Sequence, residues 1–171
     1  MKKLLLVFAA ALMCSGLFAQ VAGNWVAYDD AEGNGGSSTA TATENNGVVN
    51  FTGTVTTQYQ YGYAGIRTDD AEFLEALKTA KGIKLTVKGD GKKYSVRVET
   101  NDRPDYCFHQ FTFPTTAKEN TLIIPFNKLT QEPWGKKVPF NPRNIKTVSI
   151  HTVGQPIELY NLDIVKLEIL K

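Results

Sequence analysis

Hydrophobic and polar residues alternate most regularly between positions 83 and 100 of the chain. Apolar residues occupy the odd positions in 83–88 and the even positions in 94–99. A period of two is typical of β-strands, because successive side chains point to opposite faces of a sheet. Gly89-Asp90-Gly91 stands between the two runs, and Asp-Gly is favoured in hairpin turns because glycine adopts positive φ readily. The pattern therefore predicts two strands joined as a β-hairpin.

Similar patterns predict further strands at 25–28, 39–43, 49–55, 59–63, 106–113, 121–126, 145–152 and 157–170. In 59–63, Tyr59, Tyr61 and Tyr63 are expected to share one face. One helix is predicted between Asp69 and Ala80, with Asp69 and Glu72 as a capping box and an apolar stripe of Phe73, Leu74 and Leu77. About ten short strands with one helix predict an all-β fold, an antiparallel jelly-roll β-sandwich.

The N-terminus has the pattern of an export signal. Two lysines precede an apolar run, 4–13, that is too short to span a bilayer, and residues 17–19 form a plausible cleavage site before Gln20. We expect residues 1–19 to be a signal peptide and residues 20–171 to be a single domain. The protein is accordingly predicted to be periplasmic or secreted.

The net charge of the chain points to no charged partner. The full chain has 19 Lys and Arg residues against 17 Asp and Glu residues, and removal of Lys2 and Lys3 leaves 17 against 17. A net charge near zero, without a long run of one sign, argues against a nucleic-acid or anionic-membrane partner. No segment of the predicted mature chain reads as a membrane span.

The two cysteines do not form an internal disulfide in this reading. Cys14 lies in the predicted signal peptide, and Ala11 and Met13 fit a lipid-attachment motif poorly. Cys107 then remains alone, and a small buried strand residue is the simpler interpretation for it than a reactive thiol.

Signals for catalysis are weak. His109 and His151 each lie within a predicted strand, without metal-ligand spacing or a nearby nucleophile motif. The doublets Asp29-Asp30 and Asp69-Asp70 could be glycosidase carboxylates, but turn and capping roles explain them equally. We therefore predict a binding domain and not an enzyme, with no cofactor.

A structural calcium site is an open alternative. Asp30 in the first loop and Asp163 on the last strand would meet if the terminal strands pair, and carboxylate oxygens suit Ca²⁺. The competing interpretation is an ordinary turn aspartate and a strand-end aspartate.

Aromatic residues point more directly to a ligand. Exposed rings stack on the apolar faces of sugars while polar side chains bond the hydroxyls. Beside Tyr59, Tyr61, Tyr63, Tyr106 and Trp134, the polar partners would be Ser95, Arg97, Glu99, His109 and Gln110. The predicted groove lies where Ser95, Arg97 and Glu99 face alternate residues of 106–113, so the predicted ligand-binding residues are Tyr63, Ser95, Arg97, Glu99, His109 and Trp134. Core packing is the alternative role for any single ring.

Several segments, in order along the chain, resemble the complex-I intermediate-associated protein family. They are Asp30 to Ser38, with Gly35-Gly36 preceded by Asn34 where the family usually has Met, and 49–53, 62–67, 88–94, 125–126, 134–136 and 162–164. The resemblance implies a galactose-binding-like sandwich, similar to family-eleven carbohydrate-binding modules. It also implies a non-catalytic domain that binds glycan or protein.

Two functions remain open from the sequence. The first is a carbohydrate-binding-module-like domain that recognises a glycan in a shallow groove. The second is a periplasmic interaction or assembly domain, such as a scaffold or envelope-filament component, whose partner is another envelope protein. A concave polar groove would favour the first, and a flat apolar patch the second.

Overall fold

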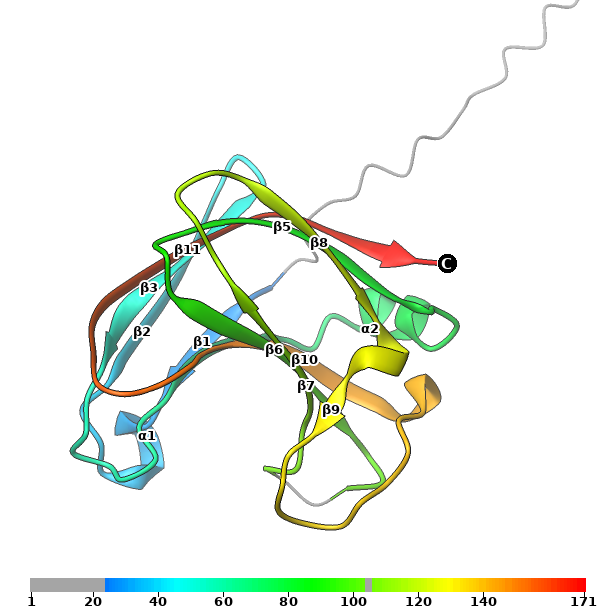
Figure 1. The fold of residues 1–171 in the computed structure, drawn as a ribbon, viewed down its shortest axis with the longest axis horizontal. Helices are drawn as coiled ribbons and strands as arrows, with labels where there is room; N and C mark the ends of the chain where they lie inside the picture. Colours follow the sequence, from blue (N-terminus) through cyan, green and yellow to red (C-terminus); the bar gives the residue numbers. More distant parts are fainter. Residues whose placement is uncertain (1–23, 104–105) are drawn as a thin grey trace, which may run out of the picture.

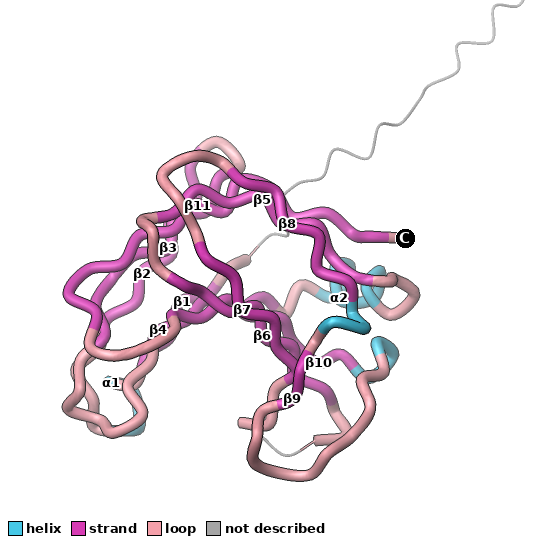
Figure 2. The backbone as a smooth tube through the Cα atoms, in the orientation of Figure 1, coloured by secondary structure: helices cyan, strands magenta, loops and turns pink. Residues whose placement is uncertain are grey.

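The protein folds as two antiparallel β-sheets that face each other. The computed structural model describes residues 24–103 and 106–171, and Figures 1 and 2 show the two sheets as stacked layers. In spatial order, the six-stranded sheet, sheet A, contains β1 (Val26–Asp29), β4 (Ala64–Thr68), β10 (Ile145–Thr152), β6 (Lys93–Thr100), β7 (His109–Pro114) and β9 (Thr130–Gln131). The five-stranded sheet, sheet B, contains β2 (Thr39–Asn45), β3 (Val48–Val55), β11 (Ile157–Leu170), β5 (Gly82–Gly89) and β8 (Asn120–Pro125). The predicted all-β, antiparallel sandwich is confirmed.

The hydrophobic core fills the space between the sheets. Sheet B contributes Phe51 and Tyr160, whose ring centroids are 4.7 Å apart, and sheet A contributes Tyr94 and Phe113 at 6.3 Å. Apolar residues alternate with polar ones along most of the strands, so one face of each sheet is buried against the other sheet. Burial of these rings and of the aliphatic side chains between them is the main stabilising contribution.

The short helices lie at the ends of strands. They are α1 (Ala31–Asn34), α2 (Ala71–Leu77) and the 3₁₀ turns η1 (Phe126–Lys128) and η2 (Pro142–Asn144). Leu74 and Leu77 of α2 are buried, as the apolar stripe predicts. The predicted cap is wrong by one residue, because Asp70 Oδ1 and not Asp69 accepts from Phe73 N, at 2.8 Å. Glu72 therefore occupies the second helical position and cannot complete a capping box.

The predicted β-hairpin is also wrong, although its two strands exist. β5 pairs with β8 and β11 in sheet B, whereas β6 pairs with β7 and β10 in sheet A. The segment around Asp90 is therefore a connection from one sheet to the other. The apolar residues of the two strands face each other across the core, because this packing buries both apolar faces while a hairpin would place them side by side.

Asp90 holds this connection in place. Its carboxylate accepts from Lys92 N at 3.1 Å, from the Tyr94 hydroxyl at 3.2 Å and from Asn161 N of β11 at 2.9 Å. The first bond is an Asx turn, and the last joins the crossover to sheet B. Asp90, a residue type that is common in hairpin turns, therefore stabilises a connection between the two sheets.

The predicted strand at 59–63 is absent, and a loop connects β3 to β4. Gly62 N donates to Tyr59 O at 3.0 Å, which closes a turn, so the three tyrosines do not share a strand face. Tyr63 N donates to the Asp30 carboxylate at 3.0 Å, so a side chain takes the place of a neighbouring strand.

Among the described residues, no helix is long and apolar enough to cross a membrane.

Candidate functional site

The outer face of sheet A carries polar side chains, whereas its inner face carries apolar side chains of the core. Strand register places Arg97 of β6 opposite Gln110 of β7 and Ser149 of β10. One step along, Ser95 lies opposite His151. Residues directly opposite each other in neighbouring strands share a face, so these side chains form one continuous polar surface.

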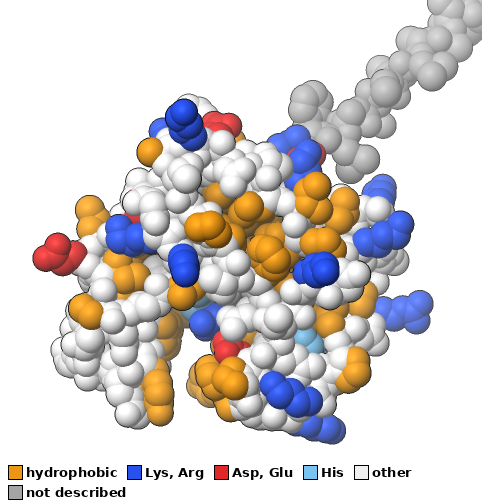
Figure 3. Space-filling model, in the orientation of Figure 1, with side chains coloured by type: hydrophobic (Ala, Val, Ile, Leu, Met, Phe, Trp, Pro, Cys, Tyr) orange, Lys and Arg blue, Asp and Glu red, His pale blue; other side chains and the backbone are white. Residues whose placement is uncertain are grey.

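This surface lies between two lobes of loops. Lobe 1 comprises α1 and residues 56–63, and lobe 2 comprises residues 106–108 and 132–138; the two project from the same end of the molecule (Figure 1). Figure 3 shows that the molecule is hollowed between them, with basic, acidic and histidine side chains inside the hollow. We call this hollow the sheet A cleft.

A hydrogen-bonded chain crosses the base of the cleft. Arg97 Nη1 lies 3.3 Å from His151 Nδ1, and the other ring nitrogen of His151 bonds the Tyr28 hydroxyl. Burial, reinforced by the nearby Arg97, holds the pKa of His151 well below its usual range, and burial raises the pKa of Tyr28 to about 12. Both groups are therefore neutral at physiological pH, and Arg97 supplies the positive charge at the base.

Arg97 is packed on two further sides. Its guanidinium carbon lies 5.0 Å from the centroid of the Phe108 ring, and Nη2 lies 3.9 Å from Glu132 Oε1. Burial lowers the pKa of Arg97, while Glu132 opposes that shift. Within the described residues, Arg97 Nε is buried without a hydrogen-bond partner. The side chain is thus largely desolvated, with one donor left unsatisfied.

Both lobes carry exposed aromatic rings. In lobe 2, Trp134 is 54% exposed and Tyr106 74% exposed, and Trp134 Nε1 donates to Tyr106 O at 3.0 Å. In lobe 1, the Tyr61 ring is 67% exposed and meets Tyr59 edge to face at 5.7 Å. Tyr63 is more enclosed, because its ring lies 6.2 Å from that of Tyr28. Such rings offer flat apolar faces next to polar side chains.

A buried carboxylate fixes lobe 1 to the sheet. Asp30 is fully buried and accepts from Ser38 N at 2.9 Å, from Ser38 Oγ at 2.7 Å and from Tyr63 N at 3.0 Å. A Cβ on Gly36 would lie 2.0 Å from Asp30 Oδ1, so the glycine makes room for this contact. Lobe 1 is therefore held by one aspartate that joins the first loop to the loop before β4.

The structure places most, but not all, of the predicted ligand-binding residues together. Ser95, Arg97 and Glu99 lie on the outer face of sheet A. Thr112 lies opposite Ser95 and Gln110 lies opposite Arg97, so alternate residues of 106–113 share this face as predicted. Ser95 is buried beneath Gln110 Oε1, at 3.2 Å, and Glu99 lies 3.8 Å from Lys146 Nζ. Tyr63 and Trp134 lie in the two lobes.

His109 is the exception, and its assignment to this groove is wrong. It lies opposite the core residue Val98 and is 1% exposed, so it points to the inner face of sheet A. The sequence contained the signal, because His109 alternates in phase with Phe111 and Phe113. A ring in phase with apolar residues belongs to the buried face.

Four residues of the cleft were not predicted: Tyr28, Glu132, Ser149 and His151. Ser149 and His151 alternate with the core residues Val148 and Ile150, so the period of β10 could have identified them. Glu132 follows a two-residue strand, and no local pattern distinguishes it. Arg67 of β4 also lies beside the cleft, with its guanidinium 5.2 Å from the Tyr28 ring centroid.

The alternative of a calcium site formed by Asp30 and Asp163 is contradicted by the sheet topology. β1 belongs to sheet A and β11 to sheet B, so the terminal strands do not pair. Asp30 is occupied by its three donors, and Asp163 Oδ1 accepts from Asn50 Nδ2 at 2.7 Å on sheet B. In residues 24–103 and 106–171, no cluster of three or more His, Cys, Asp or Glu side chains could hold a metal ion.

The sequence matches the family described as Complex I intermediate-associated protein 30 (CIA30) over residues 18–164. The chain therefore belongs to this family, as its sequence segments predicted. A curated relative is Endoglucanase 3 of Fibrobacter succinogenes, 31% identical over 75 residues. That match covers 44% of this chain and 11% of the relative, so the chain corresponds to a small part of that enzyme.

Solved carbohydrate-binding modules have a similar fold. The family 11 module from Clostridium thermocellum, solved with a β-1,3-1,4-mixed-linked tetrasaccharide, superposes with a TM-score of 0.59 at 17% identity, covering 86% of this chain and 88% of that one. A family 30 carbohydrate-binding module gives a TM-score of 0.51 at 14% identity, covering 78% and 83%. These likenesses show a carbohydrate-binding-module fold.

Proposed function

We propose that this protein is an exported, non-catalytic domain that binds a glycan in the sheet A cleft. The observation that carries the proposal is the polar outer face of sheet A, where Arg97, Gln110 and Ser149 lie in register between two lobes that present exposed rings. A sugar offers hydroxyls to the polar base and apolar ring faces to the exposed aromatic rings.

The chemistry of the cleft suits a neutral polysaccharide. Arg97 is balanced by the nearby Glu132, and His151 and Tyr28 are neutral, so the base does not present a strong field of one sign. Gln110 Oε1 accepts from Ser95 Oγ, which leaves the amide nitrogen of Gln110 as a donor for a sugar hydroxyl. Such a bond requires no charge on the ligand.

The alternative of a protein-interaction domain fits the cleft less well. A hollow with polar, partly desolvated side chains differs from the flat apolar patch expected of a protein interface. The known similarities support the glycan as well, because a family 11 module of the same fold was solved with a β-linked tetrasaccharide. We take a β-linked glucan as the first ligand to test.

Affinity electrophoresis of the domain in gels with soluble β-1,3-1,4-glucan tests this proposal, with other plant, bacterial and host glycans as a panel. We expect retardation that Gln110→Ala weakens by about threefold to tenfold, the scale of one lost hydrogen bond to a ligand. Asn161→Ala is the matched control, because it removes a carboxamide from sheet B, where it bonds Asn50 at 2.8 Å. It should leave retardation unchanged.

Two outcomes would overturn the proposal. One is the absence of binding across the whole panel by a folded domain. The other is glycan binding that Gln110→Ala and Trp134→Ala both leave intact, because the ligand would then lie outside the cleft.

A further inference from the structure

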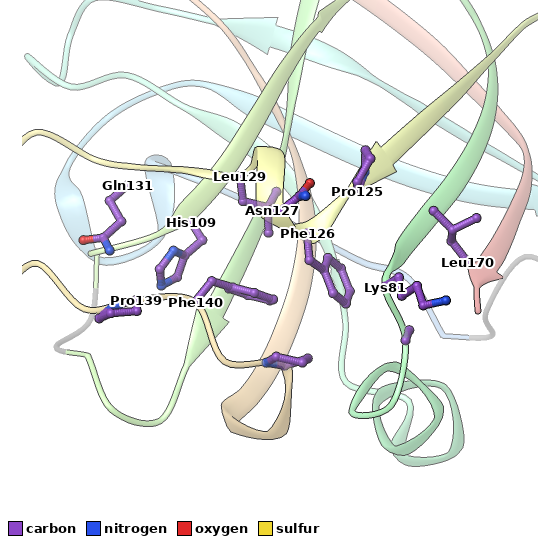
Figure 4. Close-up of a pocket in the computed structure, with 12 residues that line it drawn as sticks. Lys81, His109, Pro125, Phe126, Asn127, Leu129, Gln131, Pro139, Phe140 and Leu170 are labelled. Atoms are coloured by element: carbon purple, nitrogen blue, oxygen red, sulfur yellow. The ribbon is translucent and has the colours of Figure 1, made fainter.

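A pocket separate from the cleft lies on the inner side of sheet A, where His109 lines it. It has a volume of about 770 Å³, within the range of small-molecule sites. It opens where β7, η1 and the segment before η2 meet the C-terminal end of β11, and Figure 4 shows its walls. No residue of this pocket takes part in the sheet A cleft.

Aromatic and aliphatic side chains form most of the wall. The Phe126 and Phe140 rings meet at 4.9 Å between centroids, and His109 stands edge to face with Phe140 at 5.0 Å. Leu129, Pro139 and other apolar residues complete the lining. Three rings in succession give an apolar surface that suits a flat aromatic body.

One buried polar atom lacks a partner at this wall. His109 is 1% exposed, and its Nε2 has no hydrogen-bond partner among the described residues. Figure 4 shows the imidazole at one end of the pocket, with Lys81 at the other. An unpartnered buried nitrogen is costly, and a ligand group that bonds it would recover that cost. A hydroxyl satisfies either tautomer, because it both donates and accepts.

One charged side chain, Lys81, belongs to the lining of the pocket. Lys128 and Arg143 are the chain neighbours of the lining residues Asn127 and Pro142. All three side chains are exposed, and in the described part of the chain none of them forms an ion pair with an acid. The lining itself contains no Asp or Glu. An anionic group beside Lys81 would complement its charge.

We propose that this pocket is a second ligand site, which binds a small aromatic carboxylate. The carboxylate lies at Lys81, the aromatic body lies against Phe126 and Phe140, and a hydroxyl at the far end bonds His109 Nε2. The site is independent of the glycan cleft, because the two lie on opposite faces of sheet A.

Calorimetric titration with 4-hydroxycinnamate tests the proposal. We expect saturable binding, weaker by about fivefold for cinnamate, which lacks the hydroxyl, and by about threefold to fivefold for the methyl ester, which lacks the charge. Lys81→Gln should weaken 4-hydroxycinnamate as much as the ester does. Lys118→Gln, a lysine in the turn between β7 and β8, should leave its affinity unchanged.

NMR of the unmodified protein keeps the test independent of any His109 variant, which could fail to fold. The His109 ring signals should shift during the titration, and Gln110→Ala in the cleft should not alter binding. No saturation up to about 10 mM, well above the affinity range of specific small ligands, would overturn the proposal. So would unshifted His109 signals, equal affinity for the ester and the acid, tighter binding of the aliphatic decanoate, or loss of binding in Gln110→Ala.

Discussion

Arg97 Nη1 lies 3.3 Å from His151 Nδ1 at the base of the sheet A cleft. An arginine can only donate, so the contact requires His151 Nδ1 to accept, and the proton of the neutral ring must be on Nε2. Nε2 then donates to the Tyr28 hydroxyl. The base of the cleft is therefore held in one hydrogen-bonding arrangement before any ligand binds, which lowers the cost of ordering it on binding.

His151 should make stability depend on pH. Burial keeps its pKa in the fold well below 6.5, while the unfolded chain takes up a proton near pH 6.5. The unfolded state therefore binds more protons, so the stabilising contribution is complete above about pH 6.5 and is lost as pH falls below it. We expect the free energy of unfolding to fall by up to about 1.4 kcal/mol per pH unit from this group.

Denaturant unfolding between about pH 5.5 and 7.5 measures this slope, in a range chosen around the reference pKa of histidine. His151→Gln should flatten it, whatever its effect on stability at pH 7.5. Burial also lowers the pKa of His109, so the slope of His109→Gln should be measured beside that of His151→Gln. An unchanged slope in His151→Gln would show that the pKa of His151 is the same in the folded and unfolded chains.

Asp30→Ala should destabilise the protein by about 3–5 kcal/mol, because it leaves three buried donors without their acceptor. Asp29→Ala is the matched neighbour: among the described residues its side chain accepts one hydrogen bond, from Ala31 N at 3.0 Å, and its loss should cost about 1 kcal/mol or less. Chemical denaturation compares the two. Equal effects would contradict the assigned role of Asp30 in lobe 1.

Trp134→Ala and Tyr61→Ala should weaken glycan binding by about twofold to tenfold each, at nearly unchanged stability. Both rings are more than half exposed, so they contribute little to the core, while an aromatic contact with a ligand is worth about 0.5–1.5 kcal/mol. Leu159→Ala, on a side chain 62% exposed in β11, is the control. Calorimetry with the glycan and thermal melting of each variant separate the two effects.

Leu85→Ala should cost about 2–5 kcal/mol and Val96→Ala about 1–3 kcal/mol, since each leaves a cavity between the sheets. The two residues lie in different sheets and are 0% and 1% exposed. Their unfolding free energies should both fall, whereas an exposed change such as Ile123→Ala should stay within about 0.5 kcal/mol. An equal loss for Ile123→Ala would show that its exposed face is covered in solution.

The export signal predicted at residues 1–19 lies outside the described residues. Expression in a bacterium that exports the protein should give a mature chain that begins at Gln20, because the cleavage-site residues precede it. Intact mass of the periplasmic or secreted product checks this. A diacylglyceryl adduct on Cys14 would show lipid attachment in place of ordinary cleavage.

The sequence by itself determined most of the strands and most of their apolar faces, although it wrongly predicted a strand at 59–63 and placed His109 on the polar face. β10 and β11 begin and end where the pattern places them, and Arg97 lies on the polar face of β6. Period-two alternation follows from the geometry of one strand, so it needs no knowledge of neighbours. The helix could be predicted because its apolar stripe and its capping residues are local signals too, and its N-cap was wrong by one residue.

Only the tertiary structure decided which strands pair and which side chains meet. Backbone hydrogen bonds are the same for every partner, so the alternation in 83–100 could not distinguish a hairpin from a crossover between sheets. Packing of both apolar faces against each other separated β5 from β6. The same packing placed His109 on the inner face of sheet A, away from Arg97, and separated Asp30, which follows β1 of sheet A, from Asp163 of sheet B. It also brought Glu132 next to Arg97, although Glu132 lies in a loop whose sequence has no regular alternation.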